Sequence, residues 1–292
     1  MQWPNLITVT GLGIHFLKND VFSTPDFVTK KYYAPYGLSW DNNGVYLCEC
    51  PNVIHYFSKN KNNNITFPCY PQGKAYHQFF YFDGYLYIAS NGNDSVNKYD
   101  VKNKKLDKQC ILKPSKSSNK AGDQDWSHIN SVFSDGNRFY IVHHNFKNPS
   151  YISVLDMDLN FIEKIENVGK QNHNVCVIKD ELYSLSSAET QITKYDLKTK
   201  KMKQISFDIS KFGLDSKLCY LRGMAKTKDC FVIGITHSHG RDLRDSKQSY
   251  LLMFSNNLDL LDVKELPATG QIREIRAISE KDFAHNGLEF PL

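Results

Sequence analysis

A pattern of polar and apolar positions recurs six times along the chain. Each copy begins with a polar or aromatic residue, continues through four or five mostly apolar residues to a turn at Gly, Asp or Asn, and returns through three or four apolar residues. The copies begin at Tyr36, His77, His128, His173, Arg222 and Glu274. Short apolar runs joined by such turns are typical of β-hairpins. The sequence therefore predicts six hairpins, whose starts lie 41 to 52 residues apart.

Further strands follow the hairpins. A third apolar run is clearest at 95–100, 151–158, 191–196 and 249–255, and a more polar stretch then leads to the next hairpin. Four antiparallel strands in each unit are typical of one blade of a β-propeller. We find no helical pattern longer than a turn or two. The expected fold class is therefore all-β, a single six-bladed β-propeller domain over residues 1–292.

The two ends of the chain complete this ring. The unit that begins at Glu274 has an inner strand but too few residues for a whole blade. Residues 1–30 contain the apolar runs that would supply its missing strands. We therefore expect the last blade to be closed by strands from both termini, an arrangement that removes two sheet edges and locks the ring.

The composition fits one large β domain in a reducing compartment. Apolar residues make up 41% of the 292 residues and aromatic residues 13%, enough to fill a large core and to favour strands. The seven cysteines are odd in number and form no CxxC pair, which predicts free, buried thiols. No apolar run approaches the ~20 residues that span a bilayer, and the first residues lack the pattern of a signal peptide. We expect a cytoplasmic protein that does not insert into a membrane.

The charge of the chain argues against nucleic acid as a partner. The formal net charge of +5 is mild for this length, and lysines gather in two runs at 102–108 and 198–203. Each run follows a strand that ends in KYD, so we interpret both as solvated turns between outer strands. A nucleic-acid binder would carry a denser basic stripe together with a recognition motif.

The six hairpin starts are also the candidate functional positions. The first strand of each blade lines the central channel of a propeller, so residues at the start of that strand converge on one mouth of the channel. Three histidines, an arginine and a glutamate at these positions are not what stability alone requires. In the third unit the turn is one residue longer, so Asn130 or Ile129 could replace His128 as the innermost group.

The loops after the second strands should reach the same mouth. They carry a second set of polar residues, Asn91, His143, His144, Glu189, His237 and His239. Grouped imidazoles can bind zinc or a transition metal, act as acids and bases near neutral pH, or hydrogen-bond to an anionic or hydroxyl-rich ligand. The planar fork of Arg222 suits a carboxylate or phosphate, and Trp126 is a candidate wall of the pocket. Glu274 could be a metal ligand, a base or the ion-pair partner of Arg222.

Short motifs at the blade starts carry a family resemblance. They are His128-Ile129-Asn130, Asn172-His173-Asn174, Arg222-Gly223-Met224 and Ile233-Gly234-Ile235-Thr236. Over about residues 75–280 this register resembles a group of uncharacterised bacterial six-bladed propellers, whose pattern is His-x-Asn, Pro-His-Ser, Arg-Gly-Leu and Val-Gly-Leu-Ser. The chain has Asn172 where that pattern has Pro, and Asn174 where it has Ser. The resemblance supports six blades and a ring of polar residues, and it transfers no activity.

The first functional hypothesis is a metal-dependent enzyme of the hydrolase, lyase or isomerase class that acts on a small polar or anionic substrate. A divalent metal would polarise a substrate oxygen or lower the pKa of bound water. Propellers of the lactonase and antibiotic-lyase kinds are similar in placing a metal at the channel mouth, an analogy of fold alone. The candidate metal ligands are His77, His128, His173 and His237. The candidate catalytic residues are Glu274, His128 and Arg222. The candidate substrate-binding residues are Arg222, Tyr36, Asn130, Trp126, His143, Glu189 and His239.

The second hypothesis is a propeller that binds a sugar, a peptide or a protein partner without chemistry. A metal at the mouth or perturbed histidine pKa values would favour the enzyme, whereas an exposed apolar patch, for example over 79–82, would favour protein binding. We expect residues 79–82 to pack inside their blade. A serine or cysteine nucleophile cannot be nominated, because the chain contains no GxSxG or GxxxxGK[ST] motif and no convincing GxGxxG motif.

Overall fold

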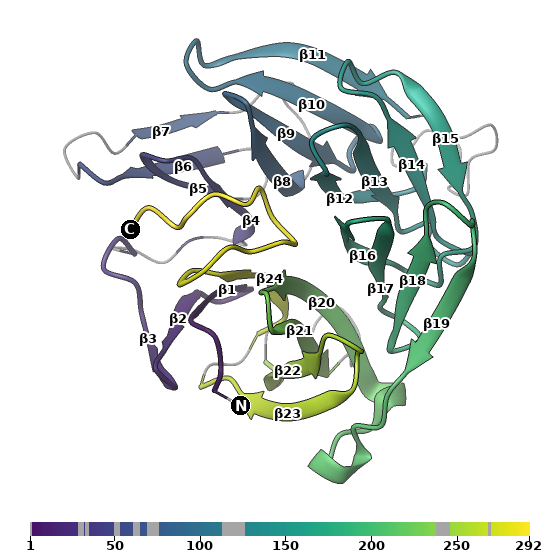
Figure 1. The fold of residues 1–292 in the computed structure, drawn as a ribbon. Helices are drawn as coiled ribbons and strands as arrows, with labels where there is room; N and C mark the ends of the chain where they lie inside the picture. Colours follow the sequence, from purple (N-terminus) through teal and green to yellow (C-terminus); the bar gives the residue numbers. More distant parts are fainter. Residues whose placement is uncertain are drawn as a thin grey trace.

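Six antiparallel sheets of four strands are arranged in a ring around a central axis (Figure 1). The computed structural model describes residues 2–28, 32, 35–49, 53–60, 65–68, 76–112, 126–237, 246–267 and 270–292. The predicted all-β, six-bladed propeller is confirmed. Within these described residues, helix is limited to the 3₁₀ turns Ser210–Phe212 and Ser216–Leu218, and no helix is long and apolar enough to cross a membrane.

Every blade has an inner strand beside the channel, two middle strands and an outer strand. Blade 1 contains β4 (Pro35–Trp40), β5 (Gly44–Glu49), β6 (Val53–Ser58) and β7 (Ile65–Pro68). Blade 2 contains β8 (Tyr76–Phe82), β9 (Tyr85–Ser90), β10 (Ser95–Asp100) and β11 (Lys105–Ile111). Blade 3 contains β12 (Ile129–Ser134), β13 (Phe139–His143), β14 (Tyr151–Leu155) and β15 (Phe161–Ile165). Blade 4 contains β16 (His173–Ile178), β17 (Glu181–Ser186), β18 (Gln191–Asp196) and β19 (Met202–Ser206). Blade 5 contains β20 (Cys219–Lys226), β21 (Cys230–His237), β22 (Ser249–Ser255) and β23 (Leu260–Glu265).

Blade 6 is built from both ends of the chain, as the sequence predicts. Its inner strand is β24 (Ile272–Ala277), and its other strands are β1 (Leu6–Thr10), β2 (Ile14–Lys18) and β3 (Val21–Ser23). β1 and β24 pair antiparallel from Leu6 opposite Ala277 to Thr10 opposite Ile272. The N-terminal and C-terminal segments therefore hold each other in place through a ladder of backbone hydrogen bonds that is interrupted once, by a bulge at Arg273.

Acidic residues stabilise the tight turns of the hairpins in blades 1 and 3. The Asp41 Oδ1 atom accepts hydrogen bonds from the backbone N–H groups of Asn43 and Gly44 at 2.7 and 2.8 Å, and Tyr46 donates its hydroxyl to Asp41 Oδ2 at 2.7 Å. Asp135 and Tyr140 repeat this arrangement in blade 3, at 2.9 Å between Tyr140 Oη and Asp135 Oδ2. These Asx turns satisfy backbone donors that the ladder leaves unpaired. These bonds thereby help to fix the length of the hairpins in blades 1 and 3.

The inner strands are buried and pack against one another around the ring. Phe79 and Phe80 of β8 are 0% and 2% exposed, as expected for residues packed inside a blade, while Tyr81 and Phe82 are half-buried. The outer strands carry the exposed side chains. The lysine runs lie at the turns that precede β11 and β19, where Lys198 pairs with Asp180 at 2.6 Å.

All six inner strands contain a β-bulge near the end at which they begin. In each, one extra residue interrupts the pairing with the neighbouring strand of its blade, as at Asn130, Asn174 and Arg273. In β4, β8 and β20 two residues oppose one, and those pairs are 36–37, 77–78 and 222–223. A bulge breaks the alternation of side chains and redirects them. Consecutive residues of each inner strand can therefore both contribute polar groups to the channel.

The C-terminal segment covers the opposite end of the channel, where it crosses the ring in yellow in Figure 1. His285 contacts Ser39 Oγ through its Nε2 atom at 3.1 Å and lies edge-on to Trp40, with ring centroids 4.3 Å apart. Asp282 accepts backbone hydrogen bonds from Lys226 and Ala277, each at 2.9 Å. This segment ties blades 1, 5 and 6 together at that end.

Candidate functional site

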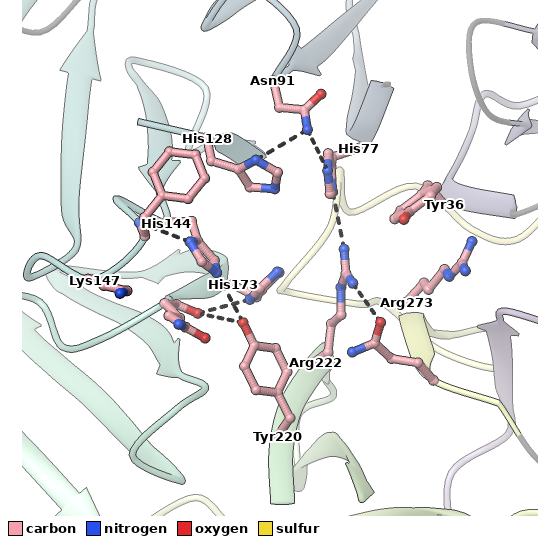
Figure 2. A pocket seen from close by; sticks show the side chains of 13 residues that line it. Tyr36, His77, Asn91, His128, His144, Lys147, His173, Tyr220, Arg222 and Arg273 are labelled. Atoms are coloured by element: carbon pink, nitrogen blue, oxygen red, sulfur yellow. Dashed lines mark hydrogen bonds between the residues drawn. The ribbon is translucent and has the colours of Figure 1, made fainter. Parts of the chain in front are cut away.

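A pocket of about 650 Å³ lies at the end of the channel where the inner strands begin (Figure 2). Its lining consists of Tyr36, His77, Asn91, His128, His144, Phe146, Lys147, Gln171, His173, Tyr220, Arg222, Gln271 and Arg273. Among the residues that the structure describes, the pocket lining includes two arginines, one lysine and four histidines but no Asp or Glu. Hydrogen-bond donors and positive charge therefore dominate the wall of this pocket.

Each blade supplies at least one residue to the pocket at or next to the predicted start of its inner strand. Tyr36, His77, His128, His173 and Arg222 all line it, as the common register of the hairpins indicates. The sixth position is occupied by Arg273 rather than by Glu274. Arg273 is the extra residue of the β24 bulge, so the side chain presented at the mouth lies one residue earlier than the repeat alone predicts.

The two arginines lie beside the ring of Tyr36. The guanidinium carbon of Arg273 is 4.2 Å from the centroid of this ring, and that of Arg222 is 5.3 Å from it. Arg222 also donates to Gln271 Oε1 at 3.2 Å and to His77 Nδ1 at 3.1 Å. These contacts hold two planar cations on one side of the pocket, in positions suited to a carboxylate or phosphate.

Hydrogen bonds from blade 2 position His128. Asp94 accepts from the backbone N–H and the hydroxyl of Ser127, the latter at 2.7 Å, and from the backbone N–H of Ile129 at 3.1 Å. His128 itself has a positive φ of 57°, an uncommon conformation for a residue with a side chain. Asp94 therefore clamps both neighbours of His128 and projects its imidazole into the pocket from just before β12.

The opposite wall contains His144, His173 and Tyr220, which lie close to one another in Figure 2. His144 Nε2 is 3.2 Å from Tyr220 Oη, and the ring centroids of His144 and His173 are 5.5 Å apart. His173 Nδ1 is 3.0 Å from the backbone carbonyl of Gln171 and 3.1 Å from Ser187 Oγ. These imidazoles are thus held by specific partners and cannot rotate freely.

Burial keeps two of the pocket histidines neutral. Burial lowers the pKa of His77 well below its usual range, and the nearby His128 and Arg222 lower it further. Burial also lowers the pKa of His173, with Arg222 the next contributor. Both rings are therefore neutral near pH 7, and each has one nitrogen that donates and one that accepts a hydrogen bond.

A second polar layer lies next to the pocket, one residue further along the inner strands. Glu274 is fully buried, accepts from Gln78 Nε2 and from Asn174 Nδ2 (3.4 Å), and forms an ion pair with Arg276 at 3.0 Å. Asn174 Oδ1 in turn accepts from the backbone N–H of Gly223 at 2.8 Å. Burial raises the pKa of Glu274 to about 7. This carboxyl therefore binds blades 2, 4 and 6 together and does not line the pocket.

Several other predicted site residues have structural partners and do not line the pocket. His143 is buried between Ser127 Oγ at 2.7 Å and Ser153 Oγ at 2.9 Å. Asn130 donates to the backbone carbonyl of Asn172 at 2.8 Å. Neither Glu189, which pairs with Lys170 at 3.3 Å, nor Trp126 is among the lining residues. The side chain of His237 and the whole of His239 lie outside the described residues.

The predicted metal ligands are only partly brought together. The ring centroids of the predicted ligands His77 and His128 are 4.9 Å apart, and the ring of His144, which was not a predicted ligand, has its centroid 5.2 Å from that of His128. Within the described part of the chain, no three His, Cys, Asp or Glu side chains are grouped so that they could hold a metal ion. The arginine, lysine and histidine side chains that line the described part of this pocket suit an anion better than a cation.

Six lining residues were missed by the sequence analysis: Phe146, Lys147, Gln171, Tyr220, Gln271 and Arg273. Two of them precede a hairpin-start residue by two positions. Gln171 precedes His173 in this way, and Tyr220 precedes Arg222. Because residues i and i+2 of an extended chain share one face, a period-2 search backward from each hairpin start would have found them.

Comparison with solved structures agrees with the propeller fold. The chain is similar to one in the crystal structure of a nidogen/laminin complex, with a TM-score of 0.65 and 12% identity, over 95% of this chain and 99% of that chain. It is also similar to a protein of unknown function from Bacteroides caccae, with a TM-score of 0.68 and 8% identity, over 95% of this chain and 100% of that chain. No family model and no curated protein matches the sequence. At such identities the likeness shows the fold alone, and that fold is β-propeller-like.

Proposed function

We propose that the mouth pocket binds a small organic anion through a carboxylate or phosphate group. The observation that carries this proposal is the pair of guanidinium groups, Arg222 and Arg273, beside Tyr36 in a pocket whose described lining contains no carboxylate. A guanidinium presents two parallel N–H groups, which match the two oxygens of a carboxylate or phosphate. Lys147 adds a further positive charge to the same lining.

Arg222 is held ready for this role by its surroundings. Its bonds to Gln271 and His77 restrict its rotation, and it is only 6% exposed. A buried, oriented cation loses little side-chain entropy when a ligand arrives, and the low local dielectric strengthens each charge-assisted hydrogen bond. We expect this residue to provide more of the binding energy than the exposed Lys147.

Isothermal titration calorimetry tests the proposal directly. The probes are small carboxylates and phosphate esters, with neutral sugars of similar size as comparison, and the variants are Arg222→Lys and Arg273→Gln. Charge-assisted hydrogen bonds contribute about 1.5–3 kcal/mol, so each variant should weaken binding of the preferred anion about tenfold or more. Arg138→Gln is the matched control, because Arg138 lies on the turn between β12 and β13 and outside the pocket. Equal binding of neutral and anionic probes, unchanged by both pocket variants, would refute the proposal.

We further propose that the pocket is the active site of an enzyme, with His128 and Arg222 in catalytic roles. Imidazoles that adjoin at about 5 Å support proton transfer between a bound ligand and the protein. Glu274 does not reach the pocket, so in this proposal it holds the layer behind His77 and His173 in place. The enzyme class and the cytoplasmic location predicted from the sequence stay predictions.

The metal-dependent version of this enzyme has its own test. Elemental analysis of untagged protein, purified without chelator, is compared with the His77→Ala/His173→Ala double variant. Near-equimolar metal in the wild type, lost from the double variant, would support a metal-assisted reaction. If the metal content does not differ between the two proteins, His77 and His173 are not metal ligands. The proposal of an anion site would be unaffected.

Membership of the uncharacterised bacterial propeller group is also a proposal. It rests on short motifs such as His128-Ile129-Asn130, whose histidine lines the pocket and whose asparagine is buried beside it. The alternative of a protein-binding propeller finds less support, because Phe79 and Phe80 are buried and residues 79–82 do not form an exposed apolar patch. The pocket is the feature that the function should use.

A further inference from the structure

The hydrogen-bond partners of each pocket histidine decide which of its nitrogens carries the proton. A backbone carbonyl can only accept, and a backbone N–H or a guanidinium can only donate. A neutral imidazole facing a carbonyl at one nitrogen must therefore be protonated there and must present a lone pair at the other. This rule separates the pocket histidines into those protonated on Nδ1 and those protonated on Nε2.

His173 presents an acceptor to the pocket. Its Nδ1 atom is 3.0 Å from the carbonyl oxygen of Gln171, so Nδ1 carries the proton and donates it. The ring is neutral, because burial and the neighbouring Arg222 hold its pKa well below the usual range. Its Nε2 atom is then unprotonated, and Figure 2 shows the ring beside Arg222.

His144 has the opposite arrangement. The backbone N–H of Phe146 donates to His144 Nδ1 at 3.1 Å, so that nitrogen holds the lone pair. The proton of the ring is therefore on Nε2, which lies 3.2 Å from Tyr220 Oη. His144 thus resembles His173 in type and location but offers a donor where His173 offers an acceptor.

His77 is also committed to partners. Arg222 donates to its Nδ1 atom at 3.1 Å, so His77 Nε2 carries the proton and faces the side-chain amide of Asn91 at 3.3 Å. That amide has to present its oxygen there, because two donors cannot share the contact; a half-turn of the Asn91 side chain exchanges its oxygen and nitrogen. His77 is consequently a bridge between Arg222 and Asn91.

We propose that the ligand is a hydroxylated organic anion, whose acidic group binds Arg222 and whose hydroxyl group donates to His173 Nε2. This inference rests on the proposed anion site and names its ligand class. A pocket of donors alone would bind any small anion of the right size. An acceptor held next to a guanidinium adds a requirement for a hydrogen-bond donor beside the acidic group, because a buried acceptor left without a donor is costly.

The first test reads the histidine tautomers without any ligand. Long-range ¹H–¹⁵N NMR spectra of the histidine side chains distinguish a protonated from an unprotonated ring nitrogen. We expect His173 to be protonated on Nδ1 and His144 on Nε2. A His173 ring protonated on Nε2 would overturn the inference and leave the anion site itself untouched.

The second test uses matched pairs of ligands, 2-hydroxyglutarate with glutarate and glycerol 3-phosphate with propyl phosphate, titrated calorimetrically. The wild type should prefer the hydroxylated member of the pair that fits by at least tenfold. His173→Asn keeps a donor for the Gln171 carbonyl but removes the Nε2 acceptor, so it should reduce this preference to about one while the deoxy member binds as before. Arg138→Gln is the control and should keep the preference, since Arg138 lies on the turn between β12 and β13 and outside the pocket.

The outcomes separate the two proposals. Anions that bind without any hydroxyl preference would refute the hydroxylated ligand and support the anion site. A hydroxyl preference that survives His173→Asn would assign the acceptor to another residue and refute the role given to His173. No binding by either class of anion would refute the anion site and, with it, this inference.

Discussion

Four buried histidines should make the protein lose stability as the pH falls from 7 to 5. Burial lowers the pKa of each of His77, His143, His173 and His285, in the case of His143 to about 3. In the unfolded chain these side chains regain the ordinary value of about 6.5. Between these values the unfolded chain binds protons that the folded protein rejects. Each such proton therefore lowers the free energy of unfolding by about 1.4 kcal/mol for every unit by which the pH is lowered.

Two buried carboxyl groups have the opposite effect on how the free energy of unfolding depends on pH. Burial raises the pKa of Glu274 to about 7 and also raises that of Asp282. The folded protein therefore holds protons on these groups that the unfolded chain releases, which stabilises the fold as the pH falls from 7 toward the ordinary carboxyl range. Four protons gained on unfolding, against at most two released, leave a net uptake of about two, and His15, whose pKa is also lowered by burial, adds to this uptake. Near pH 5.5 the loss should be about 3 kcal/mol per pH unit, a large part of a typical domain stability of ~5–15 kcal/mol.

Urea denaturation at half-unit steps between pH 5 and pH 7 measures this slope. His143→Gln removes one proton gained on unfolding and should make the dependence shallower by about 1.4 kcal/mol per pH unit. Glu274→Gln removes one proton released on unfolding and should make it steeper by about the same amount. The two variants thus shift the slope in opposite directions. A stability that stays constant or rises from pH 7 to pH 5 would show that the buried histidines are not held neutral.

Three further substitutions separate stability from binding. Gly223→Ala should cost ~2–4 kcal/mol of unfolding free energy in urea, because Gly223 has a φ of +81° and a Cβ atom there would lie 2.8 Å from Ile275 Cγ1; unchanged stability would contradict this close approach. Asp94→Asn should lower stability by ~1–3 kcal/mol and also weaken anion binding, because it replaces one of the two acceptor oxygens that hold Ser127 and the residue after His128 with an amide nitrogen that only donates; full affinity in calorimetry would show that the clamp does not matter for the site. His285→Ala should lower the thermal midpoint and leave anion affinity unchanged, because His285 lies under the opposite end of the channel.

The sequence was sufficient for the fold because the evidence for it is repeated. Each hairpin alone is a weak signal, but six hairpins at similar spacing, with turn residues such as Asp41 and Asp135 in equivalent places, leave few other architectures. The short unit at Glu274 and the apolar runs in residues 1–30 were explained together by one shared blade, and β24 pairs with β1 accordingly. Repetition averages out the errors that affect any single strand assignment.

The pocket was predicted less completely, because it depends on backbone irregularities that leave no periodic signal. Five of the six inner-strand positions could be found from the repeat, whereas the bulge at Arg273 moved the sixth position from an acidic to a basic residue. That single shift changes the character of the site, since Glu274 would have favoured a cation and Arg273 favours an anion. The loop residues were harder still: His144 lines the pocket while the adjacent His143 is buried among serines.

The bulges explain how one ring can carry both stability and function. In a regular strand, residues alternate between faces, so a residue that faces the ligand would be followed by one directed into the blade. In three of the bulged strands, two consecutive residues have different roles. These pairs are His77 and Gln78, His173 and Asn174, and Arg273 and Glu274. The first member lines the pocket, and the second joins the buried network around Glu274 that fixes the blades to one another. Substitutions at the first members should therefore change ligand preference at little cost to the ring, whereas substitutions at the second members should change stability first and binding only through it.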